Sequence, residues 1–171
     1  MKLNIAAELK IPGKEGYVKR SEPMADMEYL ARWIRFAEPV EVEARYVFDG
    51  TGFTVKGTVQ TAFSAECARC MKEFNEPFVQ EFEERFEKNA PEDGEVYGYR
   101  GEELDLSDLV RDTILLHMPT VSLCKEDCCG LCPVCGCDLN TVRCSCQREP
   151  EEEPTNPFSG LKALLNDDKE V

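Results

Sequence analysis

Apolar and polar residues alternate along the middle of the chain with a period of two. Between residues 40 and 48 every second position is apolar, and the pattern returns between residues 53 and 63. Asp49-Gly50-Thr51-Gly52 separates the two runs with residues typical of a tight turn. Such alternation is typical of strands with one buried face, so the two runs predict a long β-hairpin. Its inward-facing residues are Val40, Val42, Ala44, Tyr46, Phe48, Phe53, Val55, Val59, Thr61 and Phe63.

A third strand follows this hairpin. Phe78, Phe82 and Phe86 are four residues apart, which puts them on one face of a strand, and the residues opposite are mainly acidic. Aromatic side chains in such a stripe are typical of a packed core. Residues 89–103 form a loop rich in Pro, Gly and acidic residues, within which Val96-Tyr97 is a candidate short strand.

A helix is predicted after this loop, at residues 105–117. Asp105 is a favourable capping residue, and Leu104 is placed to pack against Leu109 at the start of the helix. The helix should end before Pro119. It carries His117, the only histidine of the chain, for which a packing or capping role is more usual than metal ligation.

The two ends of the chain give weaker patterns. In residues 1–38, Ser21 and Pro23 could begin a short helix, whereas residues 33–36 favour a strand, and both interpretations stay open. Taken together, the patterns predict an α+β fold. An antiparallel β-rich domain at residues 1–119, with one or two helices, precedes a cysteine-rich zinc-binding segment at 120–147. Residues 148–171 should form an acidic linker and a short C-terminal helix.

Charge and hydropathy narrow the function classes. The chain has 34 acidic and 20 basic residues and a formal net charge of −14, so basic proteins are easier partners than nucleic acids. Its longest apolar run, Ile114 to Met118, is far shorter than a membrane span, and the first residues have no secretory signal. We therefore expect a cytoplasmic protein without membrane contact. Cytoplasmic thiols stay reduced, so ten cysteines indicate metal or redox chemistry rather than disulfides.

The spacing of the cysteines predicts two zinc ions. Zinc in structural sites takes four tetrahedral ligands, and Cys-x-x-Cys pairs supply two at a time. The pair Cys132/Cys135, followed by a glycine, needs two further ligands, and Cys144 and Cys146 follow closely. The pair just after the hairpin can be completed by cysteines beyond the helix. The two predicted sites are Cys67, Cys70, Cys124 and Cys128, and Cys132, Cys135, Cys144 and Cys146. Cys129 and Cys137 are left over, and exchange within the neighbours 128/129, 135/137 and 144/146 stays open.

Other interpretations of the cysteines compete with structural zinc. A redox-active Cys-x-x-Cys pair usually begins a helix in a βαβ unit, which neither pair does here. Cys128, Cys132 and Cys135 match the spacing of three-cysteine iron–sulfur enzymes, but the chain lacks alternating β/α units. A zinc ion with four thiolates has no open position for water, and the chain has no His-Glu pair or phosphate loop. We therefore expect no catalytic residues and no enzymatic activity.

The cysteine motifs resemble the YceD-like family, the large ribosomal RNA subunit accumulation proteins. The resemblance rests on Cys67-Ala-Arg-Cys70, on the string from Leu123 to Gly136, and on Cys144-Ser-Cys146, and it spans residues 36–166. It implies a role in large-subunit ribosome biogenesis. Some family members have histidines in place of the Cys124/Cys128 pair and lack the second cluster. This implies that Cys124 and Cys128 belong with Cys67 and Cys70. Cys129 and Cys137 depart from the usual family pattern.

The resemblance leads to three functional hypotheses. The first is a zinc-binding, non-enzymatic factor that acts through a ribosomal protein or assembly factor of the large subunit. In this hypothesis ribosomal RNA contacts only cations near the zinc, such as Lys125 and Arg143. The second is a thiol/zinc redox or iron–sulfur enzyme. The third is a structural protein-interaction module that docks through the apolar residues Leu161, Leu164 and Leu165.

Overall fold

The computed structural model describes residues 1–29, 32–91 and 96–146 and divides the chain into two compact units, 1–128 and 129–171. The first unit is built on a five-stranded sheet in the order β2-β5-β6-β7-β8. Its strands are β2 (Glu15–Glu22), β5 (Val40–Phe48), β6 (Gly52–Glu66), β7 (Glu73–Lys88) and β8 (Tyr97–Tyr99). All neighbours are antiparallel except β7 and β8, which are parallel. The predicted fold class, β-rich with helices and a C-terminal cysteine cluster, is confirmed.

The predicted hairpin is confirmed as β5 and β6. Phe48 pairs with Phe53 across the turn, and the register runs from there to Glu41 opposite Gln60. The inward-facing side chains of both strands are buried, as the alternation predicted. β7 then pairs with β6 along its length, which makes the second hairpin longer than the first. Asp49 stabilises the first turn, because its carboxylate accepts hydrogen bonds from the amides of Thr51 and Gly52.

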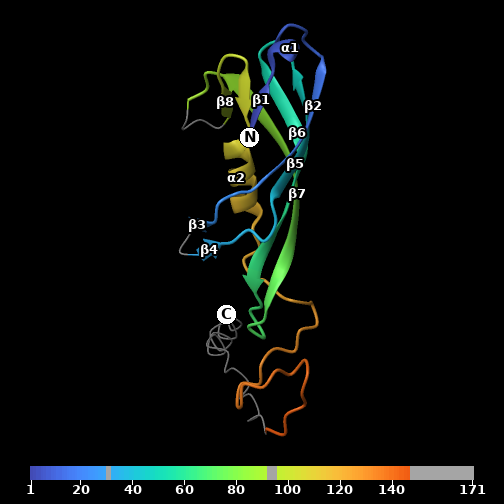
Figure 1. Cartoon of the computed structure of the whole chain (residues 1–171), viewed down its shortest axis with the longest axis vertical. Coiled ribbons are helices and arrows are strands. Elements are labelled where there is room, and N and C mark those ends of the chain that lie inside the picture. Colours follow the sequence, from blue (N-terminus) through green and yellow to red (C-terminus); the bar gives the residue numbers. More distant parts are fainter. Residues whose placement is uncertain (30–31, 92–95, 147–171) are drawn as a thin grey trace, which may run out of the picture. The chain divides into compact units, whose positions relative to one another are not determined.

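One helix covers part of the sheet. α2 (Ser107–His117) packs against β6 and β7, and the core between them includes Phe53, Phe86, Leu109 and Ile114 (Figure 1). The predicted start of this helix was two residues early. Asp105 is the last residue of a strand, and its carboxylate accepts a hydrogen bond from the Ser107 amide at 3.0 Å instead of occupying the N-cap position.

The N-terminal region is also mostly extended. β1 (Lys2–Asn4) pairs with β9 (Glu103–Asp105), and α1 (Ala6–Leu9) follows it. β3 (Met27–Tyr29) and β4 (Arg32–Ile34) form a separate two-stranded sheet. The helix considered from Ser21 is therefore wrong, because Ser21 lies in β2 and pairs with Glu41 of β5. The alternative strand at 33–36 is close to β4.

The remaining predictions concern the C-terminal residues, the short strand at Val96-Tyr97 and the membrane. The predicted linker and helix at 148–171, including the proposed docking residues, lie outside the described residues. The short strand expected at Val96-Tyr97 corresponds to β8, at Tyr97–Tyr99. None of the helices within the described residues is both long and apolar enough to cross a membrane.

Candidate metal centre

Two segments that are far apart in the sequence supply the first set of four thiols. Cys67 and Cys70 lie in the turn between β6 and β7, and Cys124 and Cys128 lie in the loop after α2. The four Sγ atoms lie within 4.8 Å of one another. All four cysteines belong to the first compact unit. The predicted grouping of these residues is therefore the one that the fold brings together.

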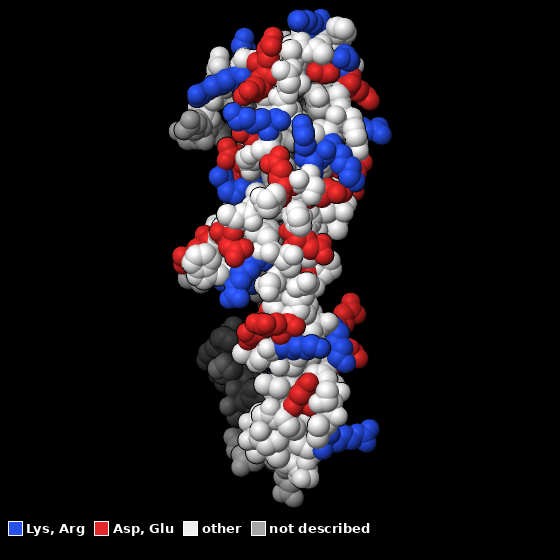
Figure 2. All heavy atoms as spheres, viewed as in Figure 1, with Lys and Arg blue, Asp and Glu red and all other residues white. Residues whose placement is uncertain are grey.

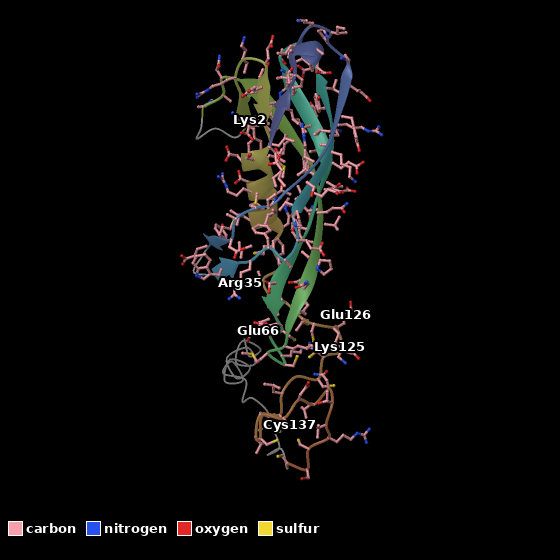
Figure 3. The ribbon with its side chains drawn as sticks, viewed as in Figure 1. Lys2, Arg35, Glu66, Lys125, Glu126 and Cys137 are labelled. Carbon is pink, nitrogen blue, oxygen red and sulfur yellow. The ribbon has the colours of Figure 1, made fainter. Side chains whose placement is uncertain are left out.

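Hydrogen bonds fasten the loop after α2 to the turn between β6 and β7. The Ala68 amide donates to the Ser122 carbonyl at 2.9 Å. The Arg69 guanidinium donates to the carbonyls of Glu126 and Cys128 at 3.1 and 3.0 Å. Figure 3 labels Glu126 in this loop. Because Arg69 bonds to the backbone beside a thiol, it positions the loop that carries half of the set.

The sulfur–sulfur distances fit one tetrahedral ion. Cys67 Sγ lies 3.8 Å from Cys128 Sγ, and Cys70 Sγ lies 3.7 Å from Cys124 Sγ. Four sulfurs placed tetrahedrally at about 2.3 Å from a zinc ion lie about 3.8 Å apart. A disulfide needs about 2.05 Å, and all ten cysteines are free thiols. The donor set and its spacing therefore suit a single thiolate-preferring metal ion.

The first set is shielded from water. Cys67, Cys70 and Cys128 are 0%, 9% and 3% exposed, and Phe74 and Leu123 pack against them. A bound cation would compensate the burial of thiolates, which is otherwise costly.

The second set lies entirely in the second compact unit. Cys132, Cys135, Cys144 and Cys146 also place their sulfurs within 4.8 Å of one another. Only Cys132 is buried, whereas Cys135 is exposed and the other two are half-buried. The spacing again suits one ion, but this site is more open to solvent than the first.

The turn that carries Cys67 and Cys70 is a tight knuckle. The Cys67 amide donates to the Lys72 carbonyl at 2.9 Å, and the Met71 amide donates to the Cys67 carbonyl at 2.9 Å. Met71 has a φ of 60°, a left-handed conformation that costs a residue with a side chain about 1–2 kcal/mol. The chain therefore accepts local strain to place the two sulfurs on one side of the turn.

The second knuckle repeats these hydrogen bonds at the same spacing. The Cys132 amide donates to the Cys137 carbonyl, and the Gly136 amide donates to the Cys132 carbonyl, both at 2.9 Å. Gly136 has a φ of 73° and occupies the position equivalent to Met71. Two Cys-x-x-Cys turns with different intervening residues thus have the same backbone arrangement, which supports the same role for both.

Backbone amides point at the first sulfur of the first knuckle. The amides of Cys124, Arg69 and Cys70 donate to Cys67 Sγ, and these hydrogen bonds hold the Cys67 pKa at about 6. Burial, together with neighbouring thiols, raises the pKa of Cys124 to about 12. One thiol of the set thus ionises readily while another resists it, and a divalent cation is what would allow all four to be thiolates.

The second knuckle has the same electrostatic arrangement. The amides of Cys135 and Val134 donate to Cys132 Sγ and lower its pKa to about 6. The pKa of Cys146 rises to about 12 because its thiol bonds to Cys135 and is partly buried. In both knuckles the amides two and three residues after the first cysteine face its sulfur, as in thiolate–metal knuckles.

The two leftover cysteines differ from each other. Cys137 is outside the group of four, but it contacts Cys135 and Cys144, which together with burial raises its pKa to about 12. Figure 3 labels it among the sulfurs of the second unit. Cys129 is exposed, and its amide donates to Asn140 Oδ1 at 2.9 Å. The structure thus brings Cys128, and not Cys129, into the first set.

Two further features bear on an open, reactive site. His117 Nδ1 lies 2.9 Å from the Thr113 carbonyl of its own helix, and His117 is in neither group of four. A hollow of about 320 Å³ lies beside the first set, and Ala68 and Ser122 line it. None of the ten cysteines lines this hollow.

The three-cysteine iron–sulfur grouping gains no support, because Cys128 belongs to the first set and Cys132 and Cys135 to the second.

Arg69 and Met71 are the residues of the site that the sequence pattern did not reveal. Arg69 was visible between the two cysteines, but its bonds depend on a loop more than fifty residues away. Met71 gave no signal, because a left-handed position is usually recognised from a glycine.

The comparison with known proteins gives a family. Residues 55–165 match the family model described as large ribosomal RNA subunit accumulation protein YceD. This match covers more than half of the chain and includes both sets of cysteines. The chain therefore belongs to the YceD family.

Similar proteins occur in plants and mycobacteria. A chloroplastic large ribosomal RNA subunit accumulation protein YCED homolog 1 of Arabidopsis thaliana is 24% identical over 74% of this chain and 50% of its own length. An uncharacterized protein of Mycobacterium tuberculosis is 30% identical over 58% of this chain and 51% of its own length. The maize homologue is 40% identical over 34% of this chain and 20% of its own. The chain thus spans about half the length, or less, of these relatives. No solved structure matches it.

Proposed function

We propose that this YceD-family protein is a non-enzymatic, zinc-binding factor that supports accumulation of large-subunit ribosomal RNA in the cytoplasm. Zinc binding is proposed because the chain has two groups of four thiols, and in each group the sulfur atoms lie within 4.8 Å of one another. The family and the names of its plant relatives support the role in ribosomal RNA accumulation.

Zinc is the ion that the donor sets suit best. Four thiolates in a tetrahedron are typical of zinc or of iron–sulfur centres. Sulfur pairs at 3.7 and 3.8 Å leave room for one ion at about 2.3 Å from each sulfur, not for a cluster of several metals. Each centre would hold its ion with four thiolates, which leaves no position for a water nucleophile. Both ions would therefore stabilise the fold rather than catalyse a reaction.

A structural role fits the position of the first centre. The loop after α2 meets the β6–β7 turn through Arg69, the Ala68–Ser122 bond and the four thiols. A zinc ion would cross-link these segments in place of a larger apolar core. Among residues 129–146, the described part of the second unit, Cys132 is the only buried apolar residue, so a metal would contribute much of the folding free energy of this segment.

The charges favour a protein partner over direct RNA binding. Over the face shown in Figure 2, Lys and Arg side chains are interspersed with Asp and Glu instead of forming a basic patch. Lys125, beside the first set, forms an ion pair with Asp127, and Arg69 bonds to backbone carbonyls. Arg69 is therefore poorly available to phosphates, whereas the exposed ion pair of Lys125 holds this lysine only weakly. A basic ribosomal protein or assembly factor is the partner class that a chain of charge −14 suits.

The test combines metal content with ribosomal RNA levels. Elemental analysis of the purified, reduced protein should give two zinc ions per chain, and Cys67→Ser and Cys135→Ser should each lose one. Cells that lack the protein should have a lower ratio of large-subunit to small-subunit ribosomal RNA, which the wild-type gene restores and Cys67→Ser does not. Iron with sulfide in the protein would overturn the zinc assignment. An unchanged RNA ratio in the deletion cells would overturn the biological role.

A reactive thiol would point to the enzyme hypothesis instead. In the metal-loaded protein, the eight thiols of the two sets should resist alkylation. Cys129, which is exposed and belongs to neither set, should be alkylated. Rapid alkylation of Cys67 or Cys70 with the metal bound would contradict the closed structural site.

A further inference from the structure

The long strand β7 is paired on only part of one side. β6 pairs with it from Glu73 to Glu87, whereas β8 pairs with it only from Phe86 to Lys88. Along residues 73–85, no strand within the described ranges lies on the other side of β7 (Figure 1). Exposed edges of this length are unusual, because their free backbone groups attract further strands.

The register shows which backbone groups face this open edge. The Cys67 amide donates to the Lys72 carbonyl, which continues the β6–β7 ladder beyond Glu66 and Glu73. In an antiparallel ladder, residues that bond to the partner alternate with residues that do not. The even-numbered residues of β7 therefore bond to β6. Odd-numbered residues direct their amides and carbonyls to the open edge, where the Glu81 carbonyl accepts a hydrogen bond from the exchangeable side-chain amide of Gln80 at 3.0 Å.

Pro77 agrees with this assignment. It is odd-numbered, so the amide hydrogen that proline lacks would have faced the open edge, where proline is tolerated. It also limits the usable stretch, since a strand added there would find no donor at residue 77. From Val79 to Arg85 every odd residue keeps its amide, and β8 begins opposite Phe86. The open stretch spans about 23 Å at about 3.3 Å per residue.

The side chains of this stretch are mainly acidic. On its outward face Glu81 and Glu83 are exposed and Val79 is 64% exposed, whereas on the other face Glu84 is exposed and Phe82 is half-buried. Arg85 is the one basic residue between Glu73 and Arg85, and its guanidinium is engaged with Asp49 and Glu87. Lys56 pairs with Glu83 at 2.7 Å and compensates one of these three carboxylates. The edge thus has a negative charge that its own neighbours neutralise only in part.

This charge selects among possible occupants. A second copy of the chain, paired edge to edge, would bring the same glutamates against one another. RNA would meet the same repulsion through its phosphates. An extended segment with alternating lysine or arginine residues would bond to the edge amides and carbonyls and would neutralise the glutamates. The aliphatic parts of its side chains would cover Val79 on the outward face.

We propose that the edge of β7 from Val79 to Arg85 takes an extended, lysine- and arginine-rich segment of a partner protein as an additional strand of the sheet. Strand addition gains its affinity from main-chain hydrogen bonds and its selectivity from alternate side chains. The proposal rests on the proposed function only in assigning a protein partner, and it names the surface that such a partner would use.

The test uses the full chain and a labelled synthetic peptide that alternates lysine with valine and is as long as the open stretch. Fluorescence anisotropy should show binding that weakens with salt, and a peptide with glutamate in place of lysine should not bind. Hydrogen exchange should show that the bound peptide slows exchange at Val79, Glu81, Glu83 and Arg85.

Two variants at one position separate charge from backbone. Glu81→Pro removes an edge-facing amide without removing a bond to β6, whereas Glu81→Gln removes only the charge. We expect Glu81→Pro to weaken binding about tenfold or more and Glu81→Gln about threefold. Glu41→Gln, on β5 away from the edge, is the matched control and should bind as the wild type does.

Several outcomes would overturn the proposal. The first is that the glutamate peptide binds as tightly as the lysine peptide. The second is that the bound peptide slows exchange only at other residues, and the third is that Glu81→Pro and Glu81→Gln bind the peptide with equal affinity. Slow exchange at these four amides in the free protein would also do so, because the edge would then already be paired. Should Glu81→Pro fail to fold, the exchange experiment on the wild type decides. The proposed function is tested separately, since its metal content and RNA ratio do not depend on this edge.

Discussion

Serine in place of Cys128 should remove one zinc ion, whereas serine in place of the adjacent Cys129 should leave both bound. Cys128 Sγ lies 3.8 Å from Cys67 Sγ and is buried. Cys129 is exposed, and its amide is held by Asn140. The two residues are neighbours of the same type, so a general effect of changing a cysteine in this loop would be equal in both variants.

The loss of zinc affinity in Cys128→Ser can be calculated by sharing the binding free energy equally among the four ligands. Structural zinc sites bind their ion with an apparent free energy of about 10–16 kcal/mol, so one ligand of four accounts for roughly 2.5–4 kcal/mol. At about 1.4 kcal/mol for each factor of ten, Cys128→Ser should weaken zinc binding at the first set roughly 70- to 700-fold. Cys129→Ser should change it by less than about twofold, as expected for a surface substitution.

Competition with a chromophoric zinc chelator measures this difference directly. The wild type and Cys129→Ser should each yield two ions with matching affinities, and Cys128→Ser should retain one tight ion. Circular dichroism checks that the sheet is retained in each variant. The reasoning is refuted if Cys128→Ser keeps two tight ions, or if Cys129→Ser loses one.

Three further predictions concern exposure, strain and charge. A chelator should extract zinc in two phases, the exposed second set first, and Cys135→Ser should abolish the fast phase as followed by chelator absorbance. Met71→Gly should relieve the left-handed strain and stabilise the protein by about 0.5 kcal/mol, whereas Ala68→Gly in the same turn should destabilise it by a similar amount in urea unfolding. The Arg85 guanidinium and nearby amides hold the pKa of Asp49 well below its usual range. The contribution of Asp49 to stability should therefore be complete above its ordinary pKa of about 4 and be lost as pH falls toward the lowered value. Asp49→Asn should thus lower the urea midpoint at neutral pH, and its difference from the wild type should shrink in acid.

The central strands could be predicted because they bury one face. Between residues 40 and 63, burial follows the alternation of apolar residues almost position by position. The N-terminal region offered no such pattern. In β2 only Gly16 and Val18 are buried, and in β3 and β4 only Ile34 is. Strands whose side chains stay in solvent have little reason to alternate, so their pairing could not be read from the sequence.

Long-range pairing was the second limit. β1 pairs with β9 across about a hundred residues, and the short β8 joins β7 in parallel. Neither arrangement leaves a local signal, because each depends on where the intervening chain returns. The start of α2 was misplaced for a related reason. Asp105 has the chemistry of a cap, but its backbone is used in the ladder with Lys2.

The cysteines show both sides of this limit. The two-residue spacing identified each knuckle, since a knuckle is a local structure with its own backbone hydrogen bonds. The first set needs a second pair of cysteines from the loop after α2. The spacing suggested that the chain returns to the sheet after this helix, but only the fold shows that Cys124 and Cys128 come next to Cys67 and Cys70. The parallel between Met71 and Gly136 was invisible, because the same backbone conformation is occupied by residues of opposite preference.

Metal binding also bears on which partner the chain can accept. A zinc ion held by four thiolates carries a net charge of −2, so two such centres would bring the formal charge of −14 to about −18. Zinc would therefore make the protein a poorer ligand for RNA and a better one for a basic polypeptide. A zinc ion at the first set would stabilise the β6–β7 turn and fix one end of β7, whose open edge from Val79 to Arg85 carries three exposed glutamates. Zinc binding and a basic partner are thus consistent with one charge distribution, and a partner rich in acidic residues would contradict both the proposed strand addition and the proposed class of partner.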